Sequence, residues 1–176
     1  MPLPYVQGEI SLYYCSEYFS PIGKLTIASD GENLTGLWIE DQKYFAHGHC
    51  SPMTAPELPV FKTAAQWLDE YFAGKFPTAV CPPLKPAGSP FQQQRWQILL
   101  QIPYGQTITY GQISKLLGRP MSAQAVGGAV GRNPISILIP CHRVVGTDGR
   151  LAGYAGGIEK KQWLLQHEGI LPFSKK

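Results

Sequence analysis

The residues best suited to chemistry stand together at positions 139–144, which read Ile-Pro-Cys-His-Arg-Val. They place a thiol (Cys141), an imidazole (His142) and a guanidinium (Arg143) side by side at the end of an apolar run. The thiolate is the nucleophilic form of cysteine, and its pKa of about 8.5 falls when a histidine, a cation or a helix N-terminus lies close. The segment therefore predicts a nucleophilic cysteine. A lone cysteine is also a common core residue, and neighbours on a strand point to opposite faces, so the rest of the chain must decide.

The apolar run 135–139 is the element that would hold the cysteine. Its length and composition predict a buried strand, which Pro140 would end because proline has no N–H to donate. Cys141 is then expected at a strand edge or in a turn, rigidly held.

The N-terminal half predicts a small sheet covered by one helix. Strands are expected at 9–18, 24–29 and 34–39, the last two forming a hairpin. Apolar residues then recur at helical spacing from Val60 to Phe72, and Gly74 follows as a C-terminal cap. The proline-rich segment 77–90 predicts a linker, so we expect an N-terminal domain at 1–87 and a second domain at 88–176.

The second half carries clear signals for the starts of helices. Ser89 and Thr109 each stand three residues before a glutamine, which predicts two capping boxes, and Ser122 predicts a third N-cap. The first helix is expected to run to about Ile102. The second and third helices are short and are joined by a tight turn at 118–121, so together they are a candidate helix-turn-helix.

The helix expected at 123–131 consists almost entirely of small residues and holds three glycines. Each glycine costs about 1 kcal/mol of helix stability relative to alanine, which calls for a reason. Close approach to another backbone is one, and that backbone could belong to the protein core or to DNA.

After the cysteine, segment 144–151 predicts a hairpin that turns at Asp148-Gly149. A flexible loop at 153–157 and a last helix at 158–168, ended by Gly169, complete the chain.

Charge divides the chain at the linker. Residues 1–87 hold five Lys and nine Asp or Glu (−4), whereas residues 88–176 hold ten Lys or Arg and three acids (+7). A basic half suggests a polyanionic partner, although a solvated surface with a chance imbalance explains the division equally well. No segment resembles a signal peptide or a membrane span, and four widely spaced cysteines predict free thiols, so a cytoplasmic protein is expected.

Taken together, the motifs resemble the methylated-DNA-protein-cysteine methyltransferases, also called 6-O-methylguanine-DNA alkyltransferases. The resemblance covers residues 89–169 in the family's order and spacing, and it is weaker in the N-terminal half. Its elements are 109–112 (Thr-Tyr-Gly-Gln), 125–129 (Ala-Val-Gly-Gly-Ala), 133–134 (Asn-Pro), 139–144, 153–157 (Gly-Tyr-Ala-Gly-Gly) and 163–169 (Trp-Leu-Leu-Gln-His-Glu-Gly). The fold implied is α/β (α+β): a small ribonuclease-H-like sheet-plus-helix domain, then a mostly helical domain with a winged-helix-like helix-turn-helix.

The resemblance also implies a reaction. Cys141 would accept a methyl or other alkyl group from the 6-oxygen of guanine, and by extension from the 4-oxygen of thymine, irreversibly and once per molecule. His142 would deprotonate the thiol through a water, Glu168 would orient His142, and Tyr110 would donate a proton or hydrogen bond to the departing guanine. Asn133 would hold the segment that carries the cysteine. The pocket for guanine would be formed by Val144, Tyr154, Ala155 and Gly156.

The expected partner is double-stranded DNA that contains alkylated guanine, with the protein acting as a monomer away from membranes. The family places the small-residue helix in the minor groove and extrudes the target nucleotide. The residues expected at the DNA are Tyr110, Ala123, Gln124, Ala125, Gly127, Arg132 and Arg143. The family commonly has arginine where this chain has Gln124, which lacks the charge and stacking plane of a guanidinium. We therefore hypothesise that extrusion is less favourable here or depends on another residue.

Three other readings are weighed. A cofactor-dependent methyltransferase is disfavoured because no G-x-G-x-x-G motif follows an expected strand, so no cofactor is expected. A thiol hydrolase would show turnover, and a lesion-sensing DNA-binding protein without enzymatic activity would not need Cys141.

The N-terminal half also contains residues of the types that bind metals. These are Cys15, His47, His49 and Cys50, but their spacing matches no strong zinc pattern, so no metal site is expected.

Overall fold

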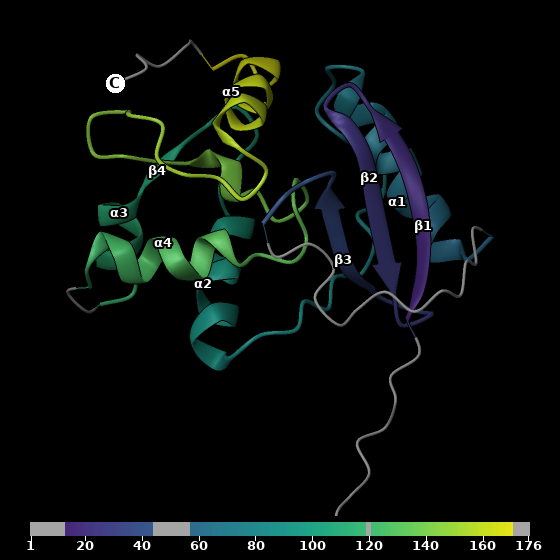
Figure 1. Ribbon diagram of the computed structural model, residues 1–176, viewed down its shortest axis with the longest axis horizontal. Coiled ribbons are helices and arrows are strands. Elements are labelled where there is room, and N and C mark those ends of the chain that lie inside the picture. Colours follow the sequence, from purple (N-terminus) through teal and green to yellow (C-terminus); the bar gives the residue numbers. More distant parts are fainter. Residues whose placement is uncertain (1–12, 44–56, 119–120, 171–176) are drawn as a thin grey trace, which may run out of the picture.

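The computed structural model describes residues 13–43, 57–118 and 121–170 and shows two lobes (Figure 1). Three strands and one helix form the N-terminal lobe, and four helices with two very short strands form most of the C-terminal lobe. This is the mixed α/β architecture expected from the sequence.

The N-terminal lobe is built on an antiparallel sheet in the order β1 (Tyr14–Ser20), β2 (Gly23–Ser29), β3 (Leu34–Ile39). The expected hairpin is confirmed, with Leu25 of β2 paired with Ile39 of β3. Positions 9–12 of the first expected strand lie outside the described residues. Helix α1 (Pro59–Phe72) packs behind the sheet and ends where the sequence predicts. Gly74 follows with φ 79°, a conformation that glycine adopts readily.

Strand β3 lies nearest to the C-terminal lobe, whereas β1 lies on the far side (Figure 1). All six residues of β3 are buried, so elements cover both faces of this strand. Gly36 leaves room for the indole of Trp38, since a Cβ at position 36 would lie 2.0 Å from Cη2 of that ring.

The proline-rich linker has no regular structure, as predicted, but it does not run free. The Leu34 N–H donates to the Pro83 carbonyl (2.7 Å), and the Lys85 N–H donates to the Leu34 carbonyl (2.8 Å). The linker therefore pairs with the first residue of β3 before it enters the second lobe.

Helices α2 (Pro90–Leu100), α3 (Tyr110–Leu116), α4 (Ala123–Gly131) and α5 (Ile158–His167) form the C-terminal lobe. Both predicted capping boxes are present, and Ser122 caps α4. Helix α2 ends two residues before the expected Ile102. Helices α3 and α4 pack against each other, as a helix-turn-helix requires, and positions 119–120 of the predicted turn lie outside the described residues. The winged-helix-like part of the expectation stays a prediction.

Two expected elements are corrected. The run 135–139 is buried but is not a strand: Ile135 makes a single parallel bridge to Leu37, and Ile137 has φ 72°. Burial alone explains the apolar composition, which cannot distinguish a buried strand from a buried turn. The hairpin at 144–151 has its turn, where the Gly146 N–H donates to the Arg150 carbonyl (2.7 Å), but no returning strand. Instead β5 (Val144–Val145) pairs in parallel with β4 (Ile108–Thr109).

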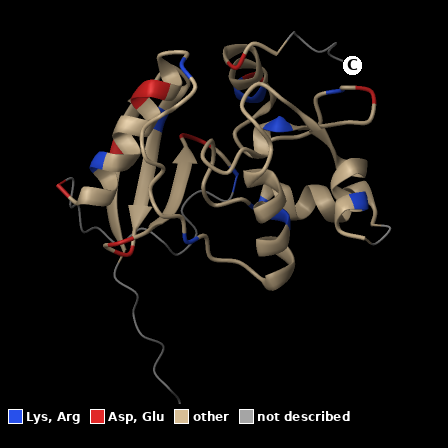
Figure 2. Cartoon of the chain, turned by 180° about the vertical axis from the view of Figure 1, so that it is seen from behind, with Lys and Arg blue, Asp and Glu red and all other residues tan. Residues whose placement is uncertain are grey.

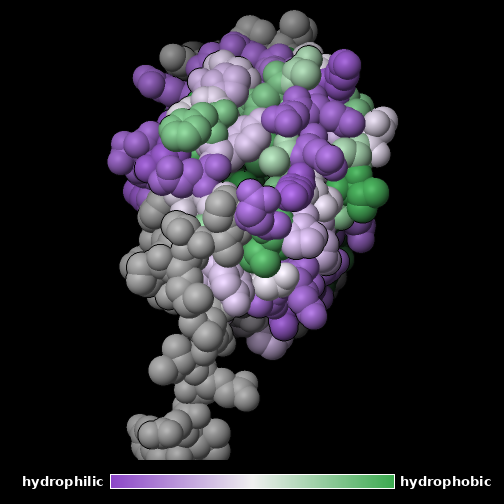
Figure 3. All heavy atoms as spheres, turned by 90° about the vertical axis from the view of Figure 1, so that its right-hand side faces the viewer, coloured by the Kyte–Doolittle hydropathy of each residue, from purple (hydrophilic) through white to green (hydrophobic). Residues whose placement is uncertain are grey.

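The charged positions of the two lobes follow the division of charge along the sequence. Basic positions are spread over the C-terminal lobe, while most acidic ones lie on α1 and near the ends of the strands (Figure 2). The face that carries β1 interleaves polar side chains with isolated apolar ones (Figure 3). Within the described ranges, the helices are too short or too polar to cross a membrane.

The close fit at Gly36 predicts a large effect on stability. A methyl group added by Gly36→Ala would collide with the buried Trp38 ring and should lower the free energy of unfolding by about 2 kcal/mol, as overpacking does. Gly128→Ala in α4 is the control: nothing lies within 4 Å of its added Cβ, so stability should hold or rise slightly. Urea unfolding followed by tryptophan fluorescence measures both. Equal midpoints for the two variants would contradict the packing argument.

Candidate active site

The side chain of Asn133 organises the turn that carries the cysteine. Its amide nitrogen donates to the carbonyl of Ile139 (2.8 Å) and lies 3.2 Å from Sγ of Cys141. Its amide oxygen accepts from the N–H of Ile135 (2.9 Å). One buried side chain thus ties the start of the turn to its end.

Cys141 begins a short 3-10 turn, η1 (Cys141–Arg143), and is only 5% exposed. Burial raises the pKa of its thiol, because an anion is poorly solvated in the interior. The hydrogen bond from Asn133, the charge of Lys161 and nearby backbone N–H groups act in the opposite direction. Ionisation of this thiol therefore depends on groups that the fold brings to it.

His142 is fully buried, and its Nε2 lies 2.6 Å from Oε1 of Glu168. An ionised carboxylate can only accept, so Nε2 carries the proton and Nδ1 is the basic nitrogen. No described residue hydrogen-bonds to that Nδ1. Burial lowers the pKa of His142 more than Glu168 raises it, which leaves a neutral imidazole able to take up a proton.

Glu168 gathers donors from four residues. Besides His142, it accepts from the Arg143 guanidinium (2.8 and 3.0 Å), the Tyr71 hydroxyl (2.8 Å) and the Gly105 N–H (3.1 Å). Burial by itself would raise the pKa of this carboxyl, but His142 and Arg143 together lower it to about 2. The carboxylate is therefore ionised at any physiological pH.

The position of Arg143 corrects one expectation. Its side chain is 9% exposed, pairs with Glu168 through Nε, and donates through a terminal nitrogen to the carbonyl of Ile102 (2.7 Å). These bonds direct the guanidinium inward. Arg143 is thus part of the support of Glu168, and its burial argues against the DNA contact that the family resemblance implied.

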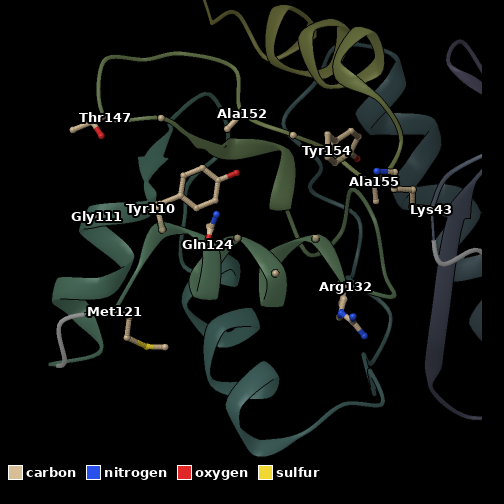
Figure 4. Close-up of a pocket in the computed structure, with 16 residues that line it drawn as sticks. Lys43, Tyr110, Gly111, Met121, Gln124, Arg132, Thr147, Ala152, Tyr154 and Ala155 are labelled. Atoms are coloured by element: carbon tan, nitrogen blue, oxygen red, sulfur yellow. The ribbon is translucent and has the colours of Figure 1, made fainter.

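A cleft of about 740 Å³ lies between the start of α3, helix α4 and the loop that follows β5 (Figure 4). Tyr110, the first residue of α3, lies in its wall with the ring over Gly127, whose added Cβ would lie 3.5 Å from the ring. Burial raises the pKa of Tyr110, and a negative charge on Cys141 raises it further. Tyr110 therefore lines the cleft and lies close to the thiol.

The structure brings most of the expected DNA-binding residues to this cleft. Its lining includes Tyr110, Ala123, Gln124, Gly127 and Arg132, while Ala125 is half-buried on the same helix. Figure 4 shows Gln124 extending from the start of α4 toward Tyr110. Added Cβ atoms at Gly128 and Gly131 would meet nothing within 4 Å, so packing within the protein does not explain these two glycines.

The loop after β5 supplies the opposite wall. Tyr154 and Ala155, two of the four residues expected to form the guanine pocket, line the cleft. The other two do not line it: Val144 is fully buried, and Gly156 packs against the Tyr154 ring, where an added Cβ would lie 2.9 Å from Cε1. The Tyr154 hydroxyl is buried, and no described residue forms a hydrogen bond with it. Burial raises its pKa, and the nearby Ser136 side chain lowers it in part.

Sequence reasoning missed three residues of this site. Lys161 is completely buried, donates to the carbonyls of Val144 (2.5 Å) and Ala152 (2.8 Å), and has its pKa lowered by burial to about 8. Tyr71 reaches Glu168 from the other lobe, and Lys43 lines the mouth of the cleft. In a sequence, lysines on a polar helix or loop are indistinguishable from lysines exposed to solvent. The contact between Tyr71 and Glu168 joins residues far apart in the chain, so no local sequence pattern predicts it.

The described ranges contain no cluster of three or more His, Cys, Asp or Glu side chains able to hold a metal ion. Of the four candidate ligands, His47, His49 and Cys50 lie outside those ranges.

Comparisons with known proteins match both lobes. A family model described as the ribonuclease-like domain of 6-O-methylguanine DNA methyltransferase matches residues 13–86, and the DNA-binding domain of the same family matches residues 90–170.

Curated relatives are similar over most of their length. A methylated-DNA–protein-cysteine methyltransferase from Haemophilus influenzae is 45% identical, with 91% of this chain and 88% of that protein covered. Its counterpart from Mycobacterium leprae is 44% identical, with 89% and 93% covered. A crystal structure of Mycobacterium tuberculosis OGT in complex with DNA superposes with a TM-score of 0.76 at 43% identity, covering 89% of this chain and 91% of that one.

The low pKa of Glu168 predicts how acid destabilises the protein. A carboxyl with a pKa of about 2 when folded and about 4.5 when unfolded contributes stability that is complete above pH 4.5. That contribution, on the order of 3 kcal/mol, is lost as the pH falls from about 4.5 to about 2. Glu168→Gln should therefore flatten the pH dependence of the unfolding free energy in this window. Glu159→Gln, at the exposed start of the same helix, is the matched control, and identical slopes for the two variants would refute the prediction.

Proposed function

Because the chain belongs to the 6-O-methylguanine DNA methyltransferase family, we propose that it repairs DNA by transferring an alkyl group from the 6-oxygen of guanine to Cys141. The observation that carries the proposal is the buried Cys141 thiol, held by Asn133 beside a neutral His142 that Glu168 orients. Nucleophile, base and orienting carboxylate are the three groups that such a transfer needs.

The proposed step balances without a cofactor. Nδ1 of His142 takes the thiol proton through a bridging water, and the thiolate attacks the alkyl carbon in line with the bond to oxygen. A carbon–sulfur bond forms as the carbon–oxygen bond breaks, and the guanine departs as an anion that the Tyr110 hydroxyl neutralises. Stabilising charge that develops in the transition state increases the rate.

The buried carboxylate supports this step. Once His142 accepts a proton, the adjacent Glu168 stabilises the imidazolium, and Arg143 keeps that carboxylate ionised. The product is a thioether on Cys141. Because the carbon–sulfur bond of a thioether does not hydrolyse in water, each molecule reacts once, and the 4-oxygen of thymine is a second acceptable donor.

The proposed substrate is a nucleotide extruded from double-stranded DNA, because a stacked base cannot reach a buried thiol. The open face of α4 at Gly128 and Gly131 lies in the minor groove, and Tyr154, Ala155 and Gly156 wall the base. Residues 1–87 and 88–176 act as two domains of a monomer, in the cytoplasm with access to DNA.

Mass spectrometry tests the proposed function directly. Incubation with an oligonucleotide that contains O6-methylguanine should add one methyl group to the peptide with Cys141, and consumption should stop at one equivalent of substrate per protein. Cys81→Ala removes an exposed thiol and should change nothing, whereas Cys141→Ala should abolish labelling. Binding without labelling would indicate a lesion sensor, and continued turnover would indicate a hydrolase.

Gln124 provides a second test, this time of base extrusion. Arginine at this position would add a charge and a stacking plane, so Gln124→Arg should speed transfer from duplex DNA several-fold and leave transfer from single-stranded DNA unchanged. Rapid-quench kinetics on both substrates measure the ratio. An unchanged duplex rate would show that Gln124 does not limit extrusion.

A further inference from the structure

We propose that Gln42, in the N-terminal lobe, is a positioning residue for Cys141, because its side chain braces the strained turn 133–141 through Ser136. The inference rests on the proposed function, since it concerns the rate of transfer to that thiol. Gln42 lies 94 residues from Ser136 in the sequence, and no motif connects them.

The turn needs bracing because of Ile137. Its φ of 72° lies in the left-handed region, which a β-branched side chain adopts only when the surroundings impose it. Ile137 is also 1% exposed, so the apolar side chain is locked in the core while its backbone is strained. Relaxation of this residue would move the chain that leads to Cys141.

Two backbone hydrogen bonds from β3 hold the chain just before Ile137. The Leu37 N–H donates to the Pro134 carbonyl (2.8 Å), and the Ser136 N–H donates to the Leu37 carbonyl (2.9 Å). Together they form the parallel bridge between Leu37 and Ile135, so the edge of the N-terminal sheet continues into the other lobe.

Gln42 adds a hydrogen bond to the side chain of Ser136. Its amide oxygen accepts from the Ile39 N–H (2.7 Å) and from the Ser136 hydroxyl (3.2 Å). The side chain is buried, and the preceding Asp41 has φ 62°, so the turn after β3 also adopts a left-handed conformation where Gln42 enters the interior. A second unusual backbone angle at the other end of this bond is consistent with a specific support.

Beyond Ile137 the turn is held by its own lobe. Asn133 binds the Ile139 carbonyl, and the Ile139 N–H donates to the Ile135 carbonyl (3.1 Å). The strained residue thus sits between an anchor from each lobe. In-line attack tolerates little displacement of the nucleophile, and an error of about 1 Å can cost a factor of about 100 in rate. Loosening the N-terminal anchor should therefore slow the chemistry without altering the DNA-binding surface.

Single-turnover kinetics of the full chain with duplex O6-methylguanine DNA separate the dissociation constant from the limiting rate of transfer. Ser136→Ala removes the donor, while Gln42 still accepts from Ile39. We expect the limiting rate to fall about fivefold, the size of one lost neutral hydrogen bond, with the dissociation constant unchanged. Because Ser136 also acts on the Tyr154 hydroxyl, Gln42→Met, which leaves Ser136 in place, separates the two contacts. This variant keeps the length of the side chain but removes the acceptor oxygen, and it should slow transfer at least as much. All rates are measured well below each variant's unfolding temperature, so global instability does not contribute.

The control is another hydrogen bond between the lobes. Lys160 Nζ donates to the Glu40 carbonyl (2.8 Å) and does not touch the turn, so Lys160→Met should leave the limiting rate unchanged. If Lys160→Met and Ser136→Ala slowed transfer equally, the slower rate would come from weaker contact between the lobes in general. That result would overturn the inference. A Ser136→Ala rate within twofold of wild type would overturn it as well, while leaving the proposed function intact. Failure of the wild type to become alkylated would remove both.

Discussion

The carboxylate of Glu168 is the interaction on which the rest of the site depends. A buried charge is tolerated only when its partners satisfy it, and here they come from η1, from α1 in the other lobe and from the backbone at Gly105. The same bonds give His142 its tautomer and turn Arg143 inward. Removal of one partner would leave the buried carboxylate with fewer hydrogen bonds and less compensation of its charge. The positions of His142, Arg143 and Tyr71 therefore depend on one another through Glu168.

The N-terminal lobe supplies no reacting group and instead positions residues of the active site in the C-terminal lobe. Tyr71 supports the carboxylate, and the edge of β3 with Gln42 supports the turn that bears the nucleophile. The strain at Ile137 makes that support necessary, because a backbone in an unfavourable conformation returns to a relaxed one unless several contacts oppose it. The two lobes therefore share the task of presenting one thiol.

Helix α4 shows how one short element meets two requirements. A Cβ added at Gly127 would lie 3.5 Å from the Tyr110 ring, an ordinary van der Waals contact, so the helix and the ring pack closely inside the protein at this position. Gly128 and Gly131 face open space, where the absence of side chains lets another molecule approach the helix backbone. The low helix propensity of such a sequence is offset by the Ser122 cap and by burial of Val126, Ala129 and Val130.

The sequence by itself determined the features that depend on neighbours along the chain. Capping boxes at Ser89 and Thr109, the hairpin of β2 and β3, and the adjacency of Cys141 and His142 involve residues close in sequence, so local patterns predict them. Long-range packing, in contrast, determines that 135–139 is a strained turn, that Arg143 pairs with Glu168, that Lys161 donates to the Val144 carbonyl and that Gln42 accepts from Ser136. These contacts join residues up to 94 positions apart in the sequence. An apolar composition indicates that a residue is buried, but it does not indicate which residues pack or hydrogen-bond with it.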